Sequence, residues 1–195
     1  MAYGVAMLLL VAATDRELCG HDGLVCGVGP VEAAVATARA LALHRFDAVL
    51  HVGLAGALGV EVGSLVVGSE SIYLDLDANW PVVKQAEPDS GLLAAALEAL
   101  PNAASMPIHT SAAVGGTSNS LLRAPLVEAM EGFGVLRAAE RAGVPAVEAR
   151  AVSNEIGEED RSRWQIGVAL DALEAALPKL VDAVLAAAPR PTPPA

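Results

Sequence analysis

The chain has 195 residues, of which 54% are apolar and 18% are charged, a composition that excludes intrinsic disorder for most of its length. Its formal net charge of −11 disfavours a broad nucleic-acid-binding surface. No apolar run approaches the roughly 20 residues that span a bilayer, and no basic residues precede the first apolar segment. We therefore expect no nucleic-acid or membrane partner and a cytoplasmic protein, with one domain over residues 1–188 and a disordered Pro-rich tail over residues 189–195.

Strand and helix patterns alternate along the chain. Apolar runs with many β-branched residues predict strands at 4–11, 24–27, 46–52, 62–73, 105–114, 126–130 and 145–152. Helical patterns cover 31–43, 92–100, 132–141 and 164–188, the last broken or kinked near Pro178. This order predicts an α/β fold with a largely parallel, buried sheet.

Polar and glycine-rich residues gather where the predicted strands end. Ligands of open α/β sheets bind at the carboxyl ends of strands, so these segments are the candidate site. They are residues 14–17, 27–30, 53–56, 130–132 and 150–154.

The turn Gly27-Val28-Gly29 precedes a helix, as in a dinucleotide-binding fingerprint. The fingerprint also needs an acid at the end of the next strand, whereas Asp47 stands at the beginning of its strand. A tight turn into a helix N-terminus, which can hold an anion or a hydroxyl, is the better interpretation.

Three charged residues occupy positions where chemistry is plausible. Glu17 follows the first strand and is either a general base or a solvated loop acid. Glu131, after Met130, can accept hydrogen bonds from two sugar hydroxyls, or it is an exposed acid at a helix N-terminus. Arg150 lies within an apolar strand, so we expect it to pair with Glu17 or Glu131, as a functional or a structural ion pair.

Metal and disulfide sites are not indicated. Cys19 and Cys26 are too few for a disulfide scaffold and lack zinc-ligand spacing, and the four histidines are scattered. We expect no metal and no cofactor.

Five motifs, in this order and at this spacing, resemble the nucleoside phosphorylase and nucleosidase superfamily over nearly the whole chain. They are Gly27-Val28-Gly29-Pro30-Val31-Glu32-Ala33-Ala34, Gly53-Leu54-Ala55-Gly56-Ala57-Leu58, Val62-Gly63-Ser64-Leu65-Val66-Val67, Met130-Glu131-Gly132 and Arg150-Ala151-Val152-Ser153-Asn154. Within the superfamily, Met130-Glu131-Gly132-Phe133-Gly134 and Ser153-Asn154 are most similar to the futalosine hydrolases.

The resemblance implies a three-layer α/β/α sandwich around a mixed, partly closed sheet, and a homodimer or higher homo-oligomer. It implies hydrolysis of the N-glycosidic bond of futalosine, a small-molecule nucleoside, to hypoxanthine and dehypoxanthinyl futalosine in menaquinone biosynthesis. Glu17 would then deprotonate the attacking water, helped by Arg150, while Glu131 holds the ribose hydroxyls with Met130 against the sugar. Further substrate contacts would come from Leu54, Ala55, Gly56, Thr117, Phe133, Ser153 and Trp164, with Phe133 and Trp164 as candidates to stack on the base.

Asn154 bears on the choice of base. The related methylthioadenosine/S-adenosylhomocysteine nucleosidases have Asp at this position, and an aspartic acid can donate to N7 and accept from a 6-amino group. An amide can donate to N7 or to a 6-oxo group, so Asn154 favours hypoxanthine over adenine. The alternatives are hydrolysis of an adenine nucleoside (methylthioadenosine, S-adenosylhomocysteine or aminofutalosine), a phosphorylase, and a non-catalytic nucleoside-binding protein.

Overall fold

The computed structural model describes residues 6–113 and 124–189. The predicted tail beyond Pro189 and the predicted contact Thr117 lie outside these residues. The element order, β1-η1-β2-α1-β3-β4-β5-α2-β6-β7-α3-β8-η2-α4, alternates strands and helices as predicted. No helix among the described residues has the length and apolar character needed to cross a membrane.

The strands form one mixed sheet. They are β1 (Leu8–Ala12), β2 (Leu24–Val25), β3 (Ala48–Leu58), β4 (Leu65–Tyr73), β5 (Gln85–Ala86), β6 (Ala104–Thr110), β7 (Leu126–Ala129) and β8 (Ala146–Glu155). Strand β3 pairs in parallel with β1 and β8 but antiparallel with β7. Because β7 pairs with β6, β6 with β4, and β4 with β8, the chain of pairings returns to β3 and closes a barrel-like core.

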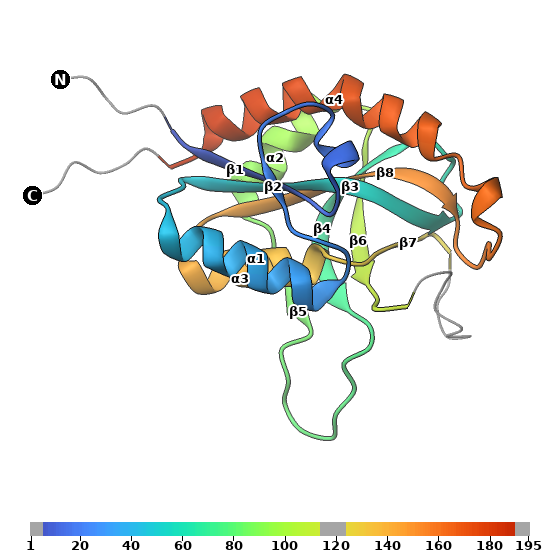
Figure 1. Cartoon of the computed structure of the whole chain (residues 1–195), viewed down its shortest axis with the longest axis horizontal. Helices are drawn as coiled ribbons and strands as arrows, with labels where there is room; N and C mark the ends of the chain where they lie inside the picture. Colours follow the sequence, from blue (N-terminus) through green and yellow to red (C-terminus); the bar gives the residue numbers. More distant parts are fainter. Residues whose placement is uncertain (1–5, 114–123, 190–195) are drawn as a thin grey trace, which may run out of the picture.

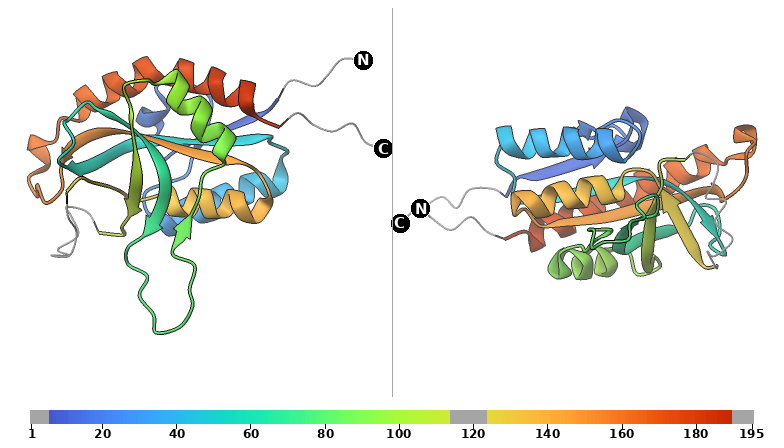
Figure 2. Two further views of the ribbon diagram at one scale, coloured as in Figure 1. Left: turned by 180° about the vertical axis from the view of Figure 1, so that it is seen from behind. Right: turned by 90° about the horizontal axis from the view of Figure 1, so that it is seen from below.

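Helices cover both faces of this sheet (Figure 1). They are α1 (Pro30–Leu43), α2 (Ser90–Ala99), α3 (Gly132–Ala142) and α4 (Ile166–Ala187), with the short 3₁₀ helices η1 (Asp15–Leu18) and η2 (Arg161–Arg163). Figure 2 shows α2 and α4 on one side and α1 and α3 on the other. The α/β/α layers and the mixed, partly closed sheet confirm the fold that the resemblance implied.

Two apolar clusters hold the layers together. One packs Leu50 and Val52 of β3 against Leu173 and Leu177 of α4, all fully buried. The other packs the opposite face of the sheet against α1 and α3. Because strands buried on both faces leave room for ligands only at their ends, this packing directs the site to the sheet edge.

Three elements differ from the sequence predictions. The sheet is mixed, as the resemblance implied, and not largely parallel as the alternation of elements predicted, since β7 runs antiparallel to β3 and β4 runs antiparallel to β8. Strand β3 continues through the glycines after Val52, because β8 hydrogen-bonds along its length. Helix α4 passes unbroken through Pro178, because Leu177 and Leu180 are fully buried on either side and their packing outweighs the lost hydrogen bond.

Candidate active site

A cavity of about 320 Å³ opens at the carboxyl ends of β1, β3 and β8, where the sequence places the candidate site. It is lined by Ala13, Thr14, Arg16, Glu17, Val28, Leu54, Ala55, Gly56, Ala113, Glu128, Ala129, Met130, Glu131, Ser153, Asn154, Ile156, Gly157, Trp164, Ile166 and Leu170. All five predicted segments contribute to this wall. Among the described residues, no group of three or more His, Cys, Asp or Glu side chains could hold a metal.

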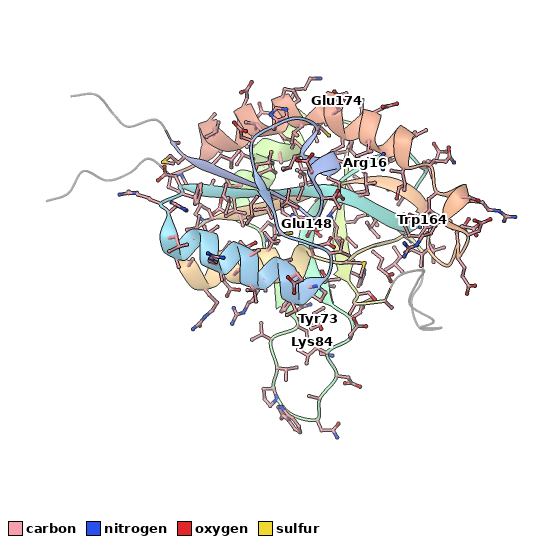
Figure 3. All side chains as sticks on the ribbon, in the orientation of Figure 1. Arg16, Tyr73, Lys84, Glu148, Trp164 and Glu174 are labelled. Atoms are coloured by element: carbon pink, nitrogen blue, oxygen red, sulfur yellow. The ribbon has the colours of Figure 1, made fainter. Side chains whose placement is uncertain are left out.

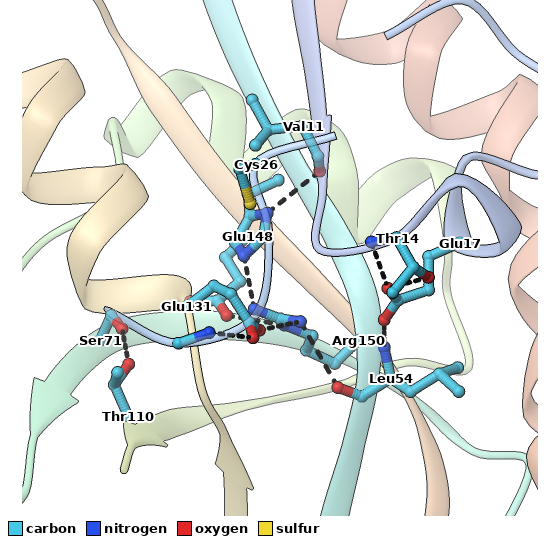
Figure 4. Close-up of polar contacts among 12 residues, drawn as sticks. Val11, Thr14, Glu17, Cys26, Leu54, Ser71, Thr110, Glu131, Glu148 and Arg150 are labelled. Atoms are coloured by element: carbon cyan, nitrogen blue, oxygen red, sulfur yellow. Dashed lines mark hydrogen bonds and ion pairs between the residues drawn. The ribbon is translucent and has the colours of Figure 1, made fainter. Parts of the chain in front are cut away.

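Glu17 is a buried carboxylate, held by three donors at the turn after β1 (Figure 4). Its Oε2 accepts from the backbone N–H of Thr14 at 2.9 Å and from the Thr14 hydroxyl at 2.7 Å. Its Oε1 accepts from the backbone N–H of Leu54 at 2.9 Å. Each carboxylate oxygen has two acceptor positions, so Oε1 keeps one free toward the cavity.

Glu131 is the second buried carboxylate of the cavity wall. Its Oε1 accepts from the backbone N–H of Gly29 at 3.1 Å, and its Oε2 lies 3.4 Å from Nη1 of Arg150. Gly29 is the N-cap of α1, with φ of 102°, a conformation that glycine adopts without strain. The anion held at this helix N-terminus is therefore Glu131, and each of its oxygens retains one acceptor position.

Arg150 is fully buried behind the cavity wall rather than in it. Its Nε donates to Oε1 of Glu148 at 2.8 Å, and its Nη2 donates to Nε2 of His51. Its Nη1 reaches Glu131 and the backbone oxygen of Leu54, both at 3.4 Å. Of the two partners that the sequence suggested, the structure shows Glu131, and it adds Glu148 two residues earlier on the same face of β8.

Burial and the Arg150 charge set the protonation of the two new partners. Burial raises the pKa of Glu148, although Arg150 opposes that shift. Burial and the charge of Arg150 lower the pKa of His51 well below 6.5, so this histidine is neutral. Because its Nε2 accepts from Arg150, its Nδ1 carries the proton and donates to the backbone oxygen of Val11 at 3.0 Å.

Gly53 makes the close approach of these groups possible. A Cβ on Gly53 would lie 2.5 Å from Nη1 of Arg150 and 2.7 Å from Oε1 of Glu17. A side chain there would displace both groups. Close packing at the centre of the site therefore explains why Gly53 is a glycine.

Asn154 faces the cavity at the end of β8, and its amide orientation is fixed. Its Oδ1 accepts from the Ser153 hydroxyl at 2.7 Å, and its Nδ2 donates to the backbone oxygen of Glu155 at 3.0 Å. The second Nδ2 proton is free to donate to a ligand. A Cβ on Gly56 would lie 3.0 Å from this nitrogen, so glycine leaves the space beside the amide open.

Of the two aromatic residues predicted to stack on the purine base, only Trp164 lines the cavity. Its indole N–H donates to the backbone oxygen of Glu158 at 2.9 Å. Phe133 does not line it, because its ring stacks on Tyr73 at 5.3 Å between centroids and packs into the core. Leu54, Ala55, Gly56, Met130 and Ser153 line the cavity as expected.

Several residues of the site were given no role of their own from the sequence, although Thr14 lies in the predicted segment 14–17. Thr14 carries a recognisable signal, because Thr followed three residues later by Glu is a capping-box pattern, and η1 has this box. Glu148 is also recognisable, since it shares a strand face with the buried Arg150. Ile156 and Leu170 lie outside the predicted segments and carry no local signal, because only the fold brings them to the cavity.

Comparison with known proteins agrees with this geometry. Residues 23–186 match the phosphorylase superfamily. The chain belongs to that superfamily. It is 41% identical to the futalosine hydrolase of Streptomyces coelicolor over 83% of this chain and 78% of that protein. It is 34% identical to the futalosine hydrolase of Acidothermus cellulolyticus over 87% of this chain and 78% of that protein. The resemblance to the futalosine hydrolases is thereby confirmed.

Solved structures of nucleosidases share the fold. The S-adenosylhomocysteine nucleosidase of Streptococcus pyogenes, in complex with 5-methylthiotubericidin, matches with a TM-score of 0.81 at 20% identity, covering 93% of this chain and 98% of that one. A Helicobacter pylori nucleosidase variant, D198N, with 5'-methylthioadenosine in its active site, matches with a TM-score of 0.80 at 17% identity, covering 91% of this chain and 98% of that one.

Proposed function

We propose that this protein hydrolyses the N-glycosidic bond of futalosine, releasing hypoxanthine and dehypoxanthinyl futalosine in menaquinone biosynthesis. The observation that carries the proposal is the convergence of Glu17, Glu131 and Asn154 on one cavity, each with an acceptor or donor left for a ligand. The 41% identity to a futalosine hydrolase supports the choice of substrate.

In this mechanism Glu17 acts on water. A water molecule donates a hydrogen bond to the free acceptor position of Oε1, while Thr14 and Leu54 prevent the carboxylate from rotating. As the bond from C1′ to N9 breaks, positive charge develops on the ribose, and the carboxylate stabilises it. The water oxygen bonds to C1′, and its proton passes to Glu17.

Glu131 and Asn154 position the two halves of the substrate. The free acceptor positions of Glu131 match the neighbouring 2′ and 3′ hydroxyls of ribose, with Met130 beside the sugar. Asn154 donates its free Nδ2 proton to N7 or O6 of the purine, which leaves as a hydrogen-bonded anion.

Arg150 serves this site as a positioning residue. It lies outside the cavity wall, and its Nη1 holds Glu131 and the backbone oxygen of Leu54 in place. Glu148 and His51 fix the guanidinium plane from behind. Glu17 receives only the longer-range charge of Arg150, across Gly53.

The proposal is tested by the fate of the sugar in phosphate buffer. A hydrolase yields the free reducing sugar, and the rate is independent of phosphate. A phosphorylase yields the sugar 1-phosphate, which mass spectrometry distinguishes. A phosphate-dependent rate with formation of the 1-phosphate would assign the protein to the phosphorylases instead.

We also propose a cytoplasmic homo-oligomer. Val31, Val35 and Leu43 on α1 are 68%, 63% and 64% exposed, an apolar face that a second copy would cover. This face begins beside Val28, which lines the cavity. Both cysteines are free, as in proteins of reducing compartments. Sedimentation should show a dimer or larger assembly, and Val35→Glu should dissociate it, whereas a monomeric wild-type protein would contradict the proposal.

A further inference from the structure

Arg16 is the positively charged side chain among the described residues that line the cavity. The acidic side chains on the same wall are Glu17, Glu128 and Glu131. Arg16 is exposed, and it belongs to none of the ion pairs found among the described residues. An arginine without an acidic partner at the wall of a ligand cavity is well suited to bind a carboxylate, which it can engage with two parallel hydrogen bonds.

The wall shared with Arg16 includes an apolar part. Trp164, Ile166 and Leu170 line the cavity from η2 and the first turns of α4. Figure 3 labels Arg16 beside α4 and Trp164, the C-cap of η2, on the segment that leads into this helix. The indole ring is fixed by its hydrogen bond to Glu158. A flat apolar spacer followed by a carboxylate matches this arrangement.

The charge of the cavity makes such a residue necessary for an anionic ligand. The chain carries a formal net charge of −11, and acidic side chains line the cavity. An anionic substrate would be repelled unless a cation met its charge locally. In the proposed mechanism Asn154 and Glu131 bind the base and the sugar hydroxyls, which leaves the wall at Arg16 and Trp164 for a substituent on the 5′ carbon.

We propose that Arg16 binds the carboxylate at the far end of the 5′ substituent of the nucleoside substrate and so determines specificity. The inference rests on the proposed function, because the 5′ substituent of futalosine ends in a benzoate. Methylthioadenosine has an uncharged 5′ substituent and gains nothing from Arg16. The site therefore selects acidic over neutral nucleosides by a residue adjacent in sequence to Glu17.

The test compares futalosine with its methyl ester, which keeps the spacer but removes the charge. For the wild-type protein we expect kcat/KM to be about tenfold higher for the acid, the effect of one charge-assisted hydrogen-bonded pair. Arg16→Ala should abolish this preference through KM, with kcat little changed, and Arg16→Lys should retain part of it. Added salt should weaken the wild-type preference, because the pair is exposed.

Arg39→Ala is the matched control. Arg39 is also exposed, so the variant loses the same charge, but Arg39 lines a different cavity between β1 and α1. It should keep the wild-type preference for the acid. An Arg16→Ala protein that still prefers the acid tenfold would overturn the inference while leaving the proposed function intact. A wild-type protein that releases no hypoxanthine from either compound would overturn both.

Discussion

Glu17 and Glu131 are both buried carboxylates, yet their hydrogen bonds suit them to different tasks. Glu17 receives three donors and keeps one acceptor position on Oε1, enough for a single water molecule. Glu131 keeps one position on each oxygen, enough for a pair of hydroxyls. These contacts therefore suit Glu17 to act as the general base and Glu131 to bind the sugar hydroxyls.

Replacing Glu17 tests whether its carboxylate is the general base. Glu17→Gln should lower kcat by about 100-fold or more, because the amide cannot accept the proton of water. The measurement is hypoxanthine release at saturating substrate, at a temperature where circular dichroism shows the variant folded. Asp15→Asn makes the same chemical change on the same 3₁₀ helix, at a residue outside the cavity wall, and should have wild-type kcat. Equal activity of Glu17→Gln and wild type would remove Glu17 as the base.

Replacing Asn154 tests whether this residue selects the purine base of the substrate. Asn154→Asp should raise kcat/KM for aminofutalosine relative to futalosine by about tenfold or more, because a carboxylate accepts from a 6-amino group and repels a 6-oxo group. Competition between the two nucleosides, followed by chromatography of adenine and hypoxanthine, measures this ratio directly. An unchanged ratio would mean that Asn154 does not read the exocyclic group.

At this scale the sequence predicted the groups that face the ligand better than those behind them. Glu17, Met130, Glu131 and Asn154 follow strands, where parallel sheets bind ligands, and all line the cavity. His51 is one of four scattered histidines in the sequence, and its hydrogen bond to Arg150 depends on β3 and β8 being neighbours. Phe133 was expected at the base but is taken up by Tyr73, a contact between β4 and α3 that no local pattern reveals.

At the scale of elements, α1 and α3 pack closely enough to exclude a methyl group. A Cβ on Gly134 would lie 2.4 Å from the backbone oxygen of Pro30 and 3.1 Å from the backbone nitrogen of Ala34. Both helices deliver site groups, since Gly29 and Glu131 are their N-caps. Their separation therefore sets the contact between Gly29 and Glu131.

Gly134→Ala should lower the free energy of unfolding by about 1–3 kcal/mol, because neither backbone can yield without moving its helix. Chemical denaturation measures the loss. Gly167→Ala is the control, since an added Cβ in the first turn of α4 meets nothing within 4 Å. It should leave stability unchanged or raise it by up to about 1 kcal/mol. Equal stability of the two variants would refute the close packing of α1 against α3.

His51 of β3 and Arg150 of β8 form a buried pair, and the low pKa of His51 makes the stability of the protein depend on pH. Its pKa is lowered below 6.5 in the folded protein, so below that pH the unfolded chain binds a proton that the folded chain does not. Stability should therefore fall with decreasing pH, by about 1.4 kcal/mol per pH unit from this group.

Urea denaturation between pH 7 and pH 5 isolates this contribution. His51→Gln can preserve both hydrogen bonds but does not titrate, so the difference between wild type and variant should change steeply with pH. His44→Gln makes the same substitution at an exposed histidine and is the control for the change of side chain. Parallel curves for His51→Gln and wild type would show that His51 is not held neutral.

The sequence predicted the ends of helices and strands where local residues determine them. It missed those that depend on contacts with neighbouring elements. Pro30 at the first helical position and Gly143 after α3 mark helix ends in the sequence, and both are ends in the structure. The passage of β3 through Gly53 and of α4 through Pro178 depends on neighbours packed against them. Strand β5, only two residues long, carries no pattern of its own.

At the scale of the whole molecule, closure of the strands around β3 brings distant segments to one cavity. Glu17, Glu131 and Asn154 are spread over most of the chain, and the pairings of β3 with β1, β7 and β8 gather them. The α/β class was predictable from the alternation of elements. Closure of the sheet was predicted only through the family resemblance, because antiparallel pairing of β4 with β8 leaves no periodic trace in the sequence.

The central claim is that this cavity hydrolyses futalosine in preference to adenine nucleosides. The measurement that tests it most directly is chromatography of the base released when purified protein is mixed separately with futalosine, aminofutalosine and methylthioadenosine. We expect hypoxanthine from futalosine at the same rate with and without phosphate, and little adenine from the other two. Adenine from the amino substrates, with futalosine left intact, would contradict the account.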